Sequence, residues 1–235
     1  MLRAKWGEVP LGNLRVKSNE LERMSDSELF ESWEAGRRRQ TEGTDGFSLR
    51  GWYHALYKPI LHGKKVLDVG SGSGVDGISF ALAGARVTFL DIVESNLQLI
   101  RRVCGIVGAR NTSYVYLEDE KSLDQLARDF DVIWCQGSQI TAPFEIVKEE
   151  DQVLMEHMKP DGRWIELAYP KSRWEREGMK PFESWGMSTD GGAPWIEWYD
   201  LDKLLRRLEP SRFEAILHFE FHDSDFVWFD LLRVE

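Results

Sequence analysis

Residues 66–74 read VLDVGSGSG and combine three regularly spaced glycines with a carboxylate. Gly70, Gly72 and Gly74 form a G-x-G-x-G loop, and glycine lets a ligand approach the backbone closely because it has no side chain. Loops of this kind usually hold phosphate at the start of a helix. Here Asp68 lies two residues before the loop, and a like charge at ~4 Å from a phosphate costs on the order of 1 to 4 kcal/mol. The pattern therefore favours a ligand without phosphate.

The ligand that such acids favour carries positive charge. Residues 72–77 also match the G-x-G-x-x-G fingerprint of dinucleotide sites, which is a weak signal by itself, so NAD is the competing ligand. A dinucleotide would place its pyrophosphate beside Asp68 and beside Asp76 in the first helical turn. S-adenosylmethionine has no phosphate and carries an ammonium and a sulfonium. We therefore expect S-adenosylmethionine as cofactor, with S-adenosylhomocysteine as its product.

Two more acids follow at the ends of the next two expected strands. Asp91 ends the run RVTFLD, where an acid hydrogen-bonds the two ribose hydroxyls of a nucleoside. Its alternative role is to cap the following helix, for which Ser95 is better placed. Glu118 ends the third expected strand and could meet the adenine amino group. Its alternative is a solvated loop acid beside Asp119 and Glu120.

The elements that must position these residues alternate between strand and helix. Short β-branched runs predict strands, and amphipathic runs with helical spacing predict the helices between them. Strands are expected at 65–69, 86–91, 112–118, 131–136 and 162–169, and helices at 74–85, 94–108, 122–130 (capped by Ser122) and 145–159. This alternation indicates a parallel sheet with helices on both faces.

The C-terminal part differs because two long apolar runs follow one another closely. A helix is expected at 201–209, and the runs cover 212–223 and 225–234. Strands joined so tightly must be antiparallel. The predicted fold class is therefore α/β: a doubly wound, mostly parallel seven-stranded sheet with a C-terminal antiparallel hairpin.

Two segments stand outside this pattern. The first contains a helix expected to begin at a capping box of Ser25 and Glu28. The second is rich in Gly, Pro and Trp without clean periodicity, and a connection of its length is typical of a lid or a substrate-binding insertion. We expect a helical cap at 1–60 and a cofactor-binding domain at 61–235 that carries a substrate lid at about 170–199.

Composition limits the partners. The formal net charge is −10, so the chain lacks the broad positive field that attracts nucleic acid or anionic lipid. Two cysteines without ligand spacing predict reduced core thiols and no metal site. No run reaches membrane-spanning length and the N-terminus lacks a signal-peptide core, so we expect a cytoplasmic protein. A homodimer stays open.

The successive motifs resemble those of the class I S-adenosylmethionine-dependent methyltransferases. VLDVGSGSG, VTFLD, DFDVIWCQG and MKPDGRWIEL carry the likeness between residues 60 and 170, and the closing hairpin fits it. The resemblance implies an enzyme with cofactor contacts at Asp68, Gly70, Ser71, Gly72, Gly74, Asp91, Ile92, Glu118 and Gln136. The fourth strand is followed by CQGSQI and not by [DN]-P-P-[YF]. That departure counts against nucleic-acid bases and protein amides as acceptors.

Catalytic groups are sought near the carboxyl ends of the strands, where doubly wound sheets bind ligands. Methyl transfer to a hydroxyl needs a base that removes its proton, and His54, Tyr169 and Glu197 are the candidates. Each has a structural alternative: a partly buried helix histidine, a core tyrosine and a lid acid, respectively. The candidate acceptor contacts are Tyr53, Gln139, Trp195 and Trp198.

Tryptophan gathers in the second half of the chain. Trp164 and Trp228 each lie in an expected strand and are expected in the core. The tryptophans of the 170–199 segment offer flat apolar faces among acids and glycines, which suit an aromatic ring or the C–H face of a sugar. We therefore expect methyl transfer to a small-molecule or glycan hydroxyl. Small-molecule N-methylation is the nearest alternative, followed by an NAD-dependent oxidoreductase and a non-catalytic cofactor-binding protein.

Overall fold

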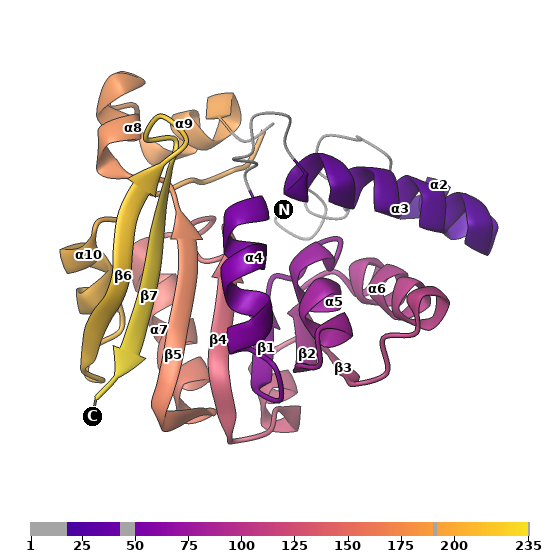
Figure 1. The fold of residues 1–235 in the computed structure, drawn as a ribbon. Coiled ribbons are helices and arrows are strands. Elements are labelled where there is room, and N and C mark those ends of the chain that lie inside the picture. The colour runs from indigo at the N-terminus through magenta and orange to yellow at the C-terminus, as the bar shows by residue number, and fades with distance from the viewer. Residues whose placement is uncertain (1–17, 43–49, 190–191, 235) are drawn as a thin grey trace. The chain divides into compact units, whose positions relative to one another are not determined.

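The structure is a computed structural model that describes residues 18–42, 50–189 and 192–234 (Figure 1). The chain divides into two compact units, an N-terminal unit at Arg3–Asp124 and a C-terminal unit built mainly from Gln125–Glu235. The strands form one seven-stranded sheet in the order β3-β2-β1-β4-β5-β7-β6. It is mostly parallel, and its last strands pair antiparallel. The predicted fold class is therefore confirmed.

The N-terminal unit contains three parallel strands. They are β1 (Lys65–Val69), β2 (Arg86–Asp91) and β3 (Thr112–Tyr116). Every residue of β1 after the first is buried, as expected for a strand covered on both faces. β1 and β2 have the predicted bounds. β3 ends two residues earlier than predicted.

The helices of the N-terminal unit begin and end largely where local signals place them. They are α2 (Ser18–Arg23), α3 (Asp26–Thr41), α4 (Gly51–Ile60), α5 (Val75–Leu82), α6 (Glu94–Val107) and the 3₁₀ helix η2 (Glu120–Gln125). The capping box of Ser25 and Glu28 is present at the start of α3. α6 ends at Gly108, whose left-handed conformation suits glycine. α2 and α3 both pack on α6 (Figure 1).

One predicted helix of this unit is wrong. The 122–130 segment holds only the short η2, and Ser122 does not cap an α-helix. Instead its Oγ accepts hydrogen bonds from the amides of Glu118 and Asp119. The hydroxyl therefore closes the turn after β3, an alternative that serine side chains offer the backbone.

The C-terminal unit carries the other four strands. Its elements are β4 (Phe130–Gln136), α7 (Phe144–Glu156), β5 (Met158–Ala168), α8 (Lys171–Arg176), α9 (Phe182–Thr189), α10 (Leu201–Arg207), β6 (Phe213–Phe221) and β7 (Phe226–Arg233). β4 and β5 are parallel, and β6 and β7 form the antiparallel hairpin. β5 begins earlier than predicted because Met158 pairs with Phe130 across an irregular register.

The 170–199 segment is less irregular than the sequence suggests. It contains α8 and α9, which are short helices separated by Gly178 and Pro181, so neither shows a long apolar period. The Trp185 side chain is fully buried and its indole N–H donates to Glu177. Packing within the C-terminal unit, not local periodicity, organises this segment.

The predicted core residues are confirmed. Trp164 and Trp228 are fully buried. Cys104 and Cys135 are free and buried, which agrees with two reduced thiols. Within the described ranges, no helix has the length and apolar character needed to cross a membrane. The same residues contain no cluster of side chains suited to hold a metal ion.

Candidate functional site

The loop between β1 and α5 has a backbone shape that favours glycine. Gly70, Gly72 and Gly74 have φ values of 68°, 55° and 70°, in the left-handed region. Ser71 Oγ donates a 2.8 Å hydrogen bond to the Asp68 carbonyl and tightens the turn. A Cβ added at Gly72 would meet no atom within 4 Å. The loop is therefore fixed in shape and open at Gly72.

Asp91, the last residue of β2, is bound to this loop. Its Oδ2 accepts a 2.9 Å hydrogen bond from the Gly72 amide, and its Oδ1 accepts one of 2.8 Å from the Val93 amide. Burial raises the pKa of Asp91, against the lowering effect of these bonds. Asn96 Nδ2 lies a further 3.5 Å from Oδ1 and 3.4 Å from Oδ2, so a ribose diol would have to replace these long contacts. Ser95 lies inside α6 and is not its N-cap, so the preference for Ser95 as the cap was wrong; Asp91 accepts the amide of Val93, the N-cap residue.

Asp68 faces the first turn of α5. Its carboxyl accepts the Gly77 amide, and burial, reinforced by the charge of Asp76, raises its pKa well above the ordinary value. A Cβ at Gly77 would lie 2.6 Å from Asp68 Oδ2 and 2.3 Å from a ring carbon of Phe89. Asp68 is thus packed into the fold. The sequence predicts that Asp68 repels a phosphate as a full negative charge beside the loop. Its burial and its raised pKa oppose that full charge.

The second acid of that argument, Asp76, is paired with a cation that sequence reasoning missed. Arg50 forms an ion pair with it, His54 Nε2 lies 2.7 Å from its Oδ1, and the Tyr53 hydroxyl donates to Oδ2 at 3.2 Å. Burial alone would raise the pKa of Asp76, but Arg50 and His54 bring it below its ordinary value. The spacing of Arg50, Tyr53 and His54 places them on one helix face and was the available signal.

Tyr53 and His54 are both interior residues. Tyr53 is fully buried and His54 is 3% exposed. His54 Nδ1 is buried and has no hydrogen-bond partner among the described residues. Because the ionised Asp76 engages Nε2, Nδ1 is the nitrogen left to accept a proton. The His54–Asp76 pair therefore has the arrangement of a base and the acid that orients it.

Ile92 and Glu118 lie in the turns that follow β2 and β3. Ile92 is half-buried, and Glu118 is exposed two residues beyond the end of β3. The Glu118 amide donates to Ser122 Oγ. Both residues follow the carboxyl ends of their strands. This is the edge of the sheet at which the cofactor is predicted to bind.

In the C-terminal unit, Gln136 ends β4 with an unusual side-chain environment. Both of its amide atoms are buried and have no hydrogen-bond partner within the described ranges, and Ser138 Oγ is in the same state. An unsatisfied buried polar atom costs about 1–3 kcal/mol, so such groups point to a missing ligand. Ser138 was not predicted, because CQGSQI carries no signal that singles it out.

Gln139 lies in the interior of the C-terminal unit. Its Nε2 donates a 2.9 Å hydrogen bond to Asp151, and its backbone carbonyl accepts from Arg207. Arg207 also pairs with Asp151 and Glu166, and these three charged side chains are fully buried. We call Asp151, Glu166 and Arg207 the buried ionic cluster. Because the side-chain amide nitrogen of Gln139 is bonded to Asp151 of this cluster, the structure does not favour the predicted contact of Gln139 with the acceptor.

Glu197 is enclosed by donors. Lys203 Nζ lies 2.6 Å from its Oε1, while the Phe144 amide and the Trp195 indole N–H each donate to Oε2 at 3.1 Å. The Phe144 amide is one of the unpaired donors at the start of α7, so Glu197 satisfies that helix end. In this arrangement its carboxylate serves the structure of the insertion and presents no free oxygen to an acceptor.

Tyr169 and Trp198 are joined by a parallel β-bridge. The Tyr169 ring packs edge-to-face on Trp185, and the Arg173 guanidinium lies 4.2 Å from its centroid. Lys203 Nζ lies 4.2 Å from the Trp198 ring. Trp198 Nε1 is buried without a partner in the part of the chain that is described. The half-buried Trp195 and Trp198 remain the insertion's candidates for an acceptor.

The amino-acid sequence has relatives over its middle part. Residues 66–162 match the family described as "Methyltransferase domain". The ubiquinone biosynthesis O-methyltransferase of Erwinia tasmaniensis is 41% identical over 75 residues, which are 32% of this chain and 30% of that protein. That of Idiomarina loihiensis is 35% identical over 105 residues, or 44% of this chain and 41% of that protein. The chain thus spans less than half the length of these relatives.

Solved structures share the fold over most of the chain. The 1,6-didemethyltoxoflavin-N1-methyltransferase of Burkholderia thailandensis, solved with 1,6-didemethyltoxoflavin and S-adenosylhomocysteine, has a TM-score of 0.59 at 16% identity and covers 89% of this chain and 87% of that one. The magnesium protoporphyrin IX methyltransferase of Synechocystis PCC 6803 has a TM-score of 0.56 at 18% identity and covers 88% and 97%. Identities this low establish the shared fold alone.

Proposed function

We propose that this chain, whose residues 66–162 match the family described as "Methyltransferase domain", is a class I S-adenosylmethionine-dependent methyltransferase that transfers the methyl group of its cofactor to a hydroxyl of a small molecule or glycan. The observation that carries the proposal is the contact between Asp91 and Gly72. It puts a buried carboxylate next to a glycine that faces open space. That pairing suits the ribose diol of a nucleoside.

The residues present fit this cofactor. The groups of the N-terminal unit that would hold it are the backbone of Gly70, Ser71, Gly72 and Gly74, the side chains of Asp91 and Glu118, and the flanking Ile92. Asp68 would not contact the cofactor directly, since its carboxyl is packed on α5. It would support the cofactor by stabilising the shape of the glycine loop. When bound, the cofactor supplies a methyl carbon activated toward displacement.

For a hydroxyl acceptor, His54 is the base that the geometry favours. Asp76 holds its Nε2, and Nδ1 is free to take the acceptor's proton. Tyr169 and Glu197 are weaker candidates because neighbouring side chains already engage them. The names of the similar ubiquinone biosynthesis O-methyltransferases support an oxygen acceptor.

One observation favours the second candidate, methylation of a small amine. His54 is almost fully buried, and a neutral amine attacks without a strong base. If the acceptor cannot reach Nδ1, an amine acceptor is the simpler solution. In either case we propose that residues 1–60, of which 1–17 and 43–49 lie outside the described residues, act as a cap of the N-terminal unit. We further propose that the 170–199 insertion binds the acceptor through the ring faces of Trp195 and Trp198.

The experiment combines binding with label transfer. Isothermal titration should show that S-adenosylhomocysteine binds and that NADH does not. Methyl-tritiated S-adenosylmethionine should then label pooled phenols or sugars, with pooled small amines as the comparison. Label in the amine pool alone would select the second candidate. Tight NADH binding without S-adenosylhomocysteine binding would contradict the cofactor, and binding without transfer to any pool would contradict the activity.

A further inference from the structure

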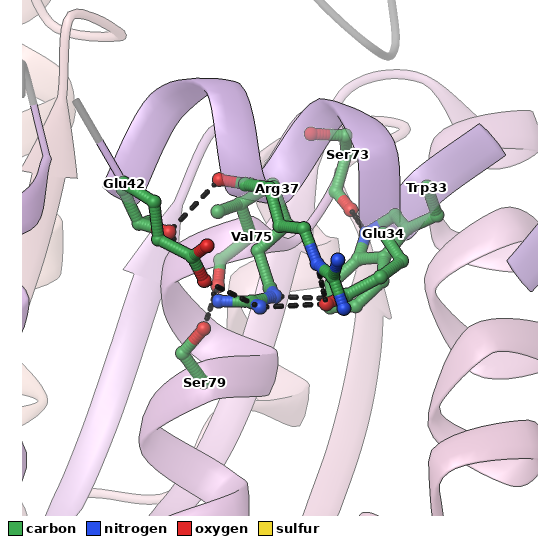
Figure 2. A network of polar contacts seen from close by, with 9 residues as sticks. Trp33, Glu34, Arg37, Glu42, Ser73, Val75 and Ser79 are labelled. Carbon is green, nitrogen blue, oxygen red and sulfur yellow. Dashed lines mark hydrogen bonds and ion pairs between the residues drawn. The ribbon is translucent and has the colours of Figure 1, made fainter. Parts of the chain in front are cut away.

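We propose that Trp33 is a positioning residue for the cofactor, because one hydrogen bond from its indole fixes the glycine loop in the shape that receives the nucleoside. The inference rests on the proposed function. Trp33 belongs to α3, which lies far from the loop in the sequence. Its Nε1 donates a 3.0 Å hydrogen bond to the Ser73 carbonyl, and the contact is drawn in Figure 2.

The bonded carbonyl sits at the most adaptable point of the loop. Ser73 lies between Gly72 and Gly74, both in the left-handed region. Glycine flanks leave a peptide unit many alternative orientations, which carry conformational entropy. The Gly72 amide is held by Asp91 and the Gly74 amide by the Ser71 carbonyl. Trp33 adds the restraint on the Ser73 carbonyl, so the peptide unit keeps one orientation before a ligand arrives.

The donor itself is rigidly placed. The Trp33 side chain is 1% exposed. At the start of α3, Arg102 of α6 pairs with Asp26 at 2.7 Å and donates to the Met24 carbonyl at 2.6 Å. Toward the end of α3, Arg37 pairs with Glu34 and Glu42 within the helix and its cap (Figure 2), and the Arg50 amide at the start of α4 donates to the Gln40 carbonyl at 2.9 Å. α3 is therefore held at both ends, and its indole reaches the loop already oriented.

We expect this restraint to increase the affinity of the protein for the cofactor. Ordering a loop on binding costs affinity, and a loop that is ordered in advance avoids the cost. Losing the Trp33 hydrogen bond should therefore weaken cofactor binding and leave the acceptor side unaffected. A tryptophan that merely fills the core would affect stability instead. Removing only the indole N–H therefore distinguishes the two roles: it weakens cofactor binding if Trp33 positions the loop and leaves binding unchanged if Trp33 only fills the core.

Trp33→Phe makes that distinction, since it keeps a buried ring and removes the donor. The matched control is Trp174→Phe, which removes a comparable 2.8 Å bond from an indole to the Lys180 carbonyl in the C-terminal unit. We expect Trp33→Phe to weaken S-adenosylhomocysteine binding about five- to tenfold, the effect of one hydrogen bond. The KM for S-adenosylmethionine should rise by the same factor, with kcat at saturating cofactor unchanged. Trp174→Phe should bind S-adenosylhomocysteine within about twofold of the unsubstituted protein.

A second measurement keeps the proposal testable if Trp33→Phe does not fold. Hydrogen exchange of the Trp33 indole N–H, followed by NMR, should slow when S-adenosylhomocysteine is added, while that of Trp174 should not. Arg102→Met, which loosens α3 without touching the loop, should weaken binding to a smaller extent. If the unsubstituted protein binds S-adenosylhomocysteine and Trp33→Phe binds it equally well, Trp33 has no positioning role. If the unsubstituted protein does not bind it, the proposed function itself fails.

Discussion

The amide nitrogen of Gly72 lies 2.9 Å from Oδ2 of Asp91. This contact joins the end of β2 to the glycine loop that follows β1 within the N-terminal unit. The same carboxylate also accepts from the Val93 amide at the approach to α6. One acid therefore organises the loop and the adjacent helix start. The proposed contact with a nucleoside would be made by the same carboxylate.

Asp91→Ala should weaken S-adenosylhomocysteine binding by about 1–3 kcal/mol, because a bidentate contact with the ribose is lost and the Gly72 amide loses its acceptor. Isothermal titration measures the change. Asp124→Ala is the control, since Asp124 is an exposed acid of the same unit. An affinity equal to that of the unsubstituted protein would remove Asp91 from the cofactor site.

His54→Gln should lower kcat for a hydroxyl acceptor about 10²- to 10⁴-fold, the usual contribution of a general base. The affinity for S-adenosylhomocysteine should stay the same, because the bond of His54 is to Asp76 in α5. Steady-state kinetics with a saturating cofactor test this. His62→Gln is the matched control, as His62 is exposed and bonds only a carbonyl. A kcat that does not fall for His54→Gln, with label on nitrogen, would favour the amine acceptor.

Asp151 should make stability depend on pH. Burial raises its pKa from 3.8 to about 8, although Arg207 opposes the shift. The folded protein therefore holds a proton that the unfolded chain releases between these two values. The free energy of unfolding should fall as the pH rises through this window, by at most about 1.4 kcal/mol per pH unit.

Urea unfolding of the protein between pH 5 and pH 8.5 measures this slope, and Asp151→Asn should flatten it. Asp202→Asn, on the exposed side of α10, should leave it intact. If the contribution of Asp151 to the free energy of unfolding instead rises with pH, its carboxyl is ionised in the buried ionic cluster.

The Glu197–Lys203 pair should be structural. Its side chains are 6% and 10% exposed, and removing one partner of a buried pair typically costs about 3–5 kcal/mol. Glu197→Gln and Lys203→Met should each lower the free energy of unfolding, and the double variant should lose less than the sum. Urea denaturation gives the coupling. If Glu197→Gln instead keeps its stability and loses kcat, Glu197 regains its role as the base.

Local patterns in the sequence were sufficient for the architecture. The bounds of β1 and β2, the capping box at Ser25 and the glycine end of α6 follow from residues next to one another, whose spacing and φ preferences act within a few positions. The predicted helix at 122–130 was wrong because a serine hydroxyl closes the turn there. At 170–199 the sequence has no clean period, so the short helices α8 and α9 were not predicted.

The sequence by itself determined the fold class, the glycine loop and the strand-end position of Asp91. Only the tertiary structure decided which charges stay free: Asp76 is paired with Arg50, and Glu197 with Lys203. The physical reason is that periodicity is a property of neighbours along the chain. The charge and hydrogen-bonding capacity of a side chain depend on burial and on partners that folding brings from elsewhere.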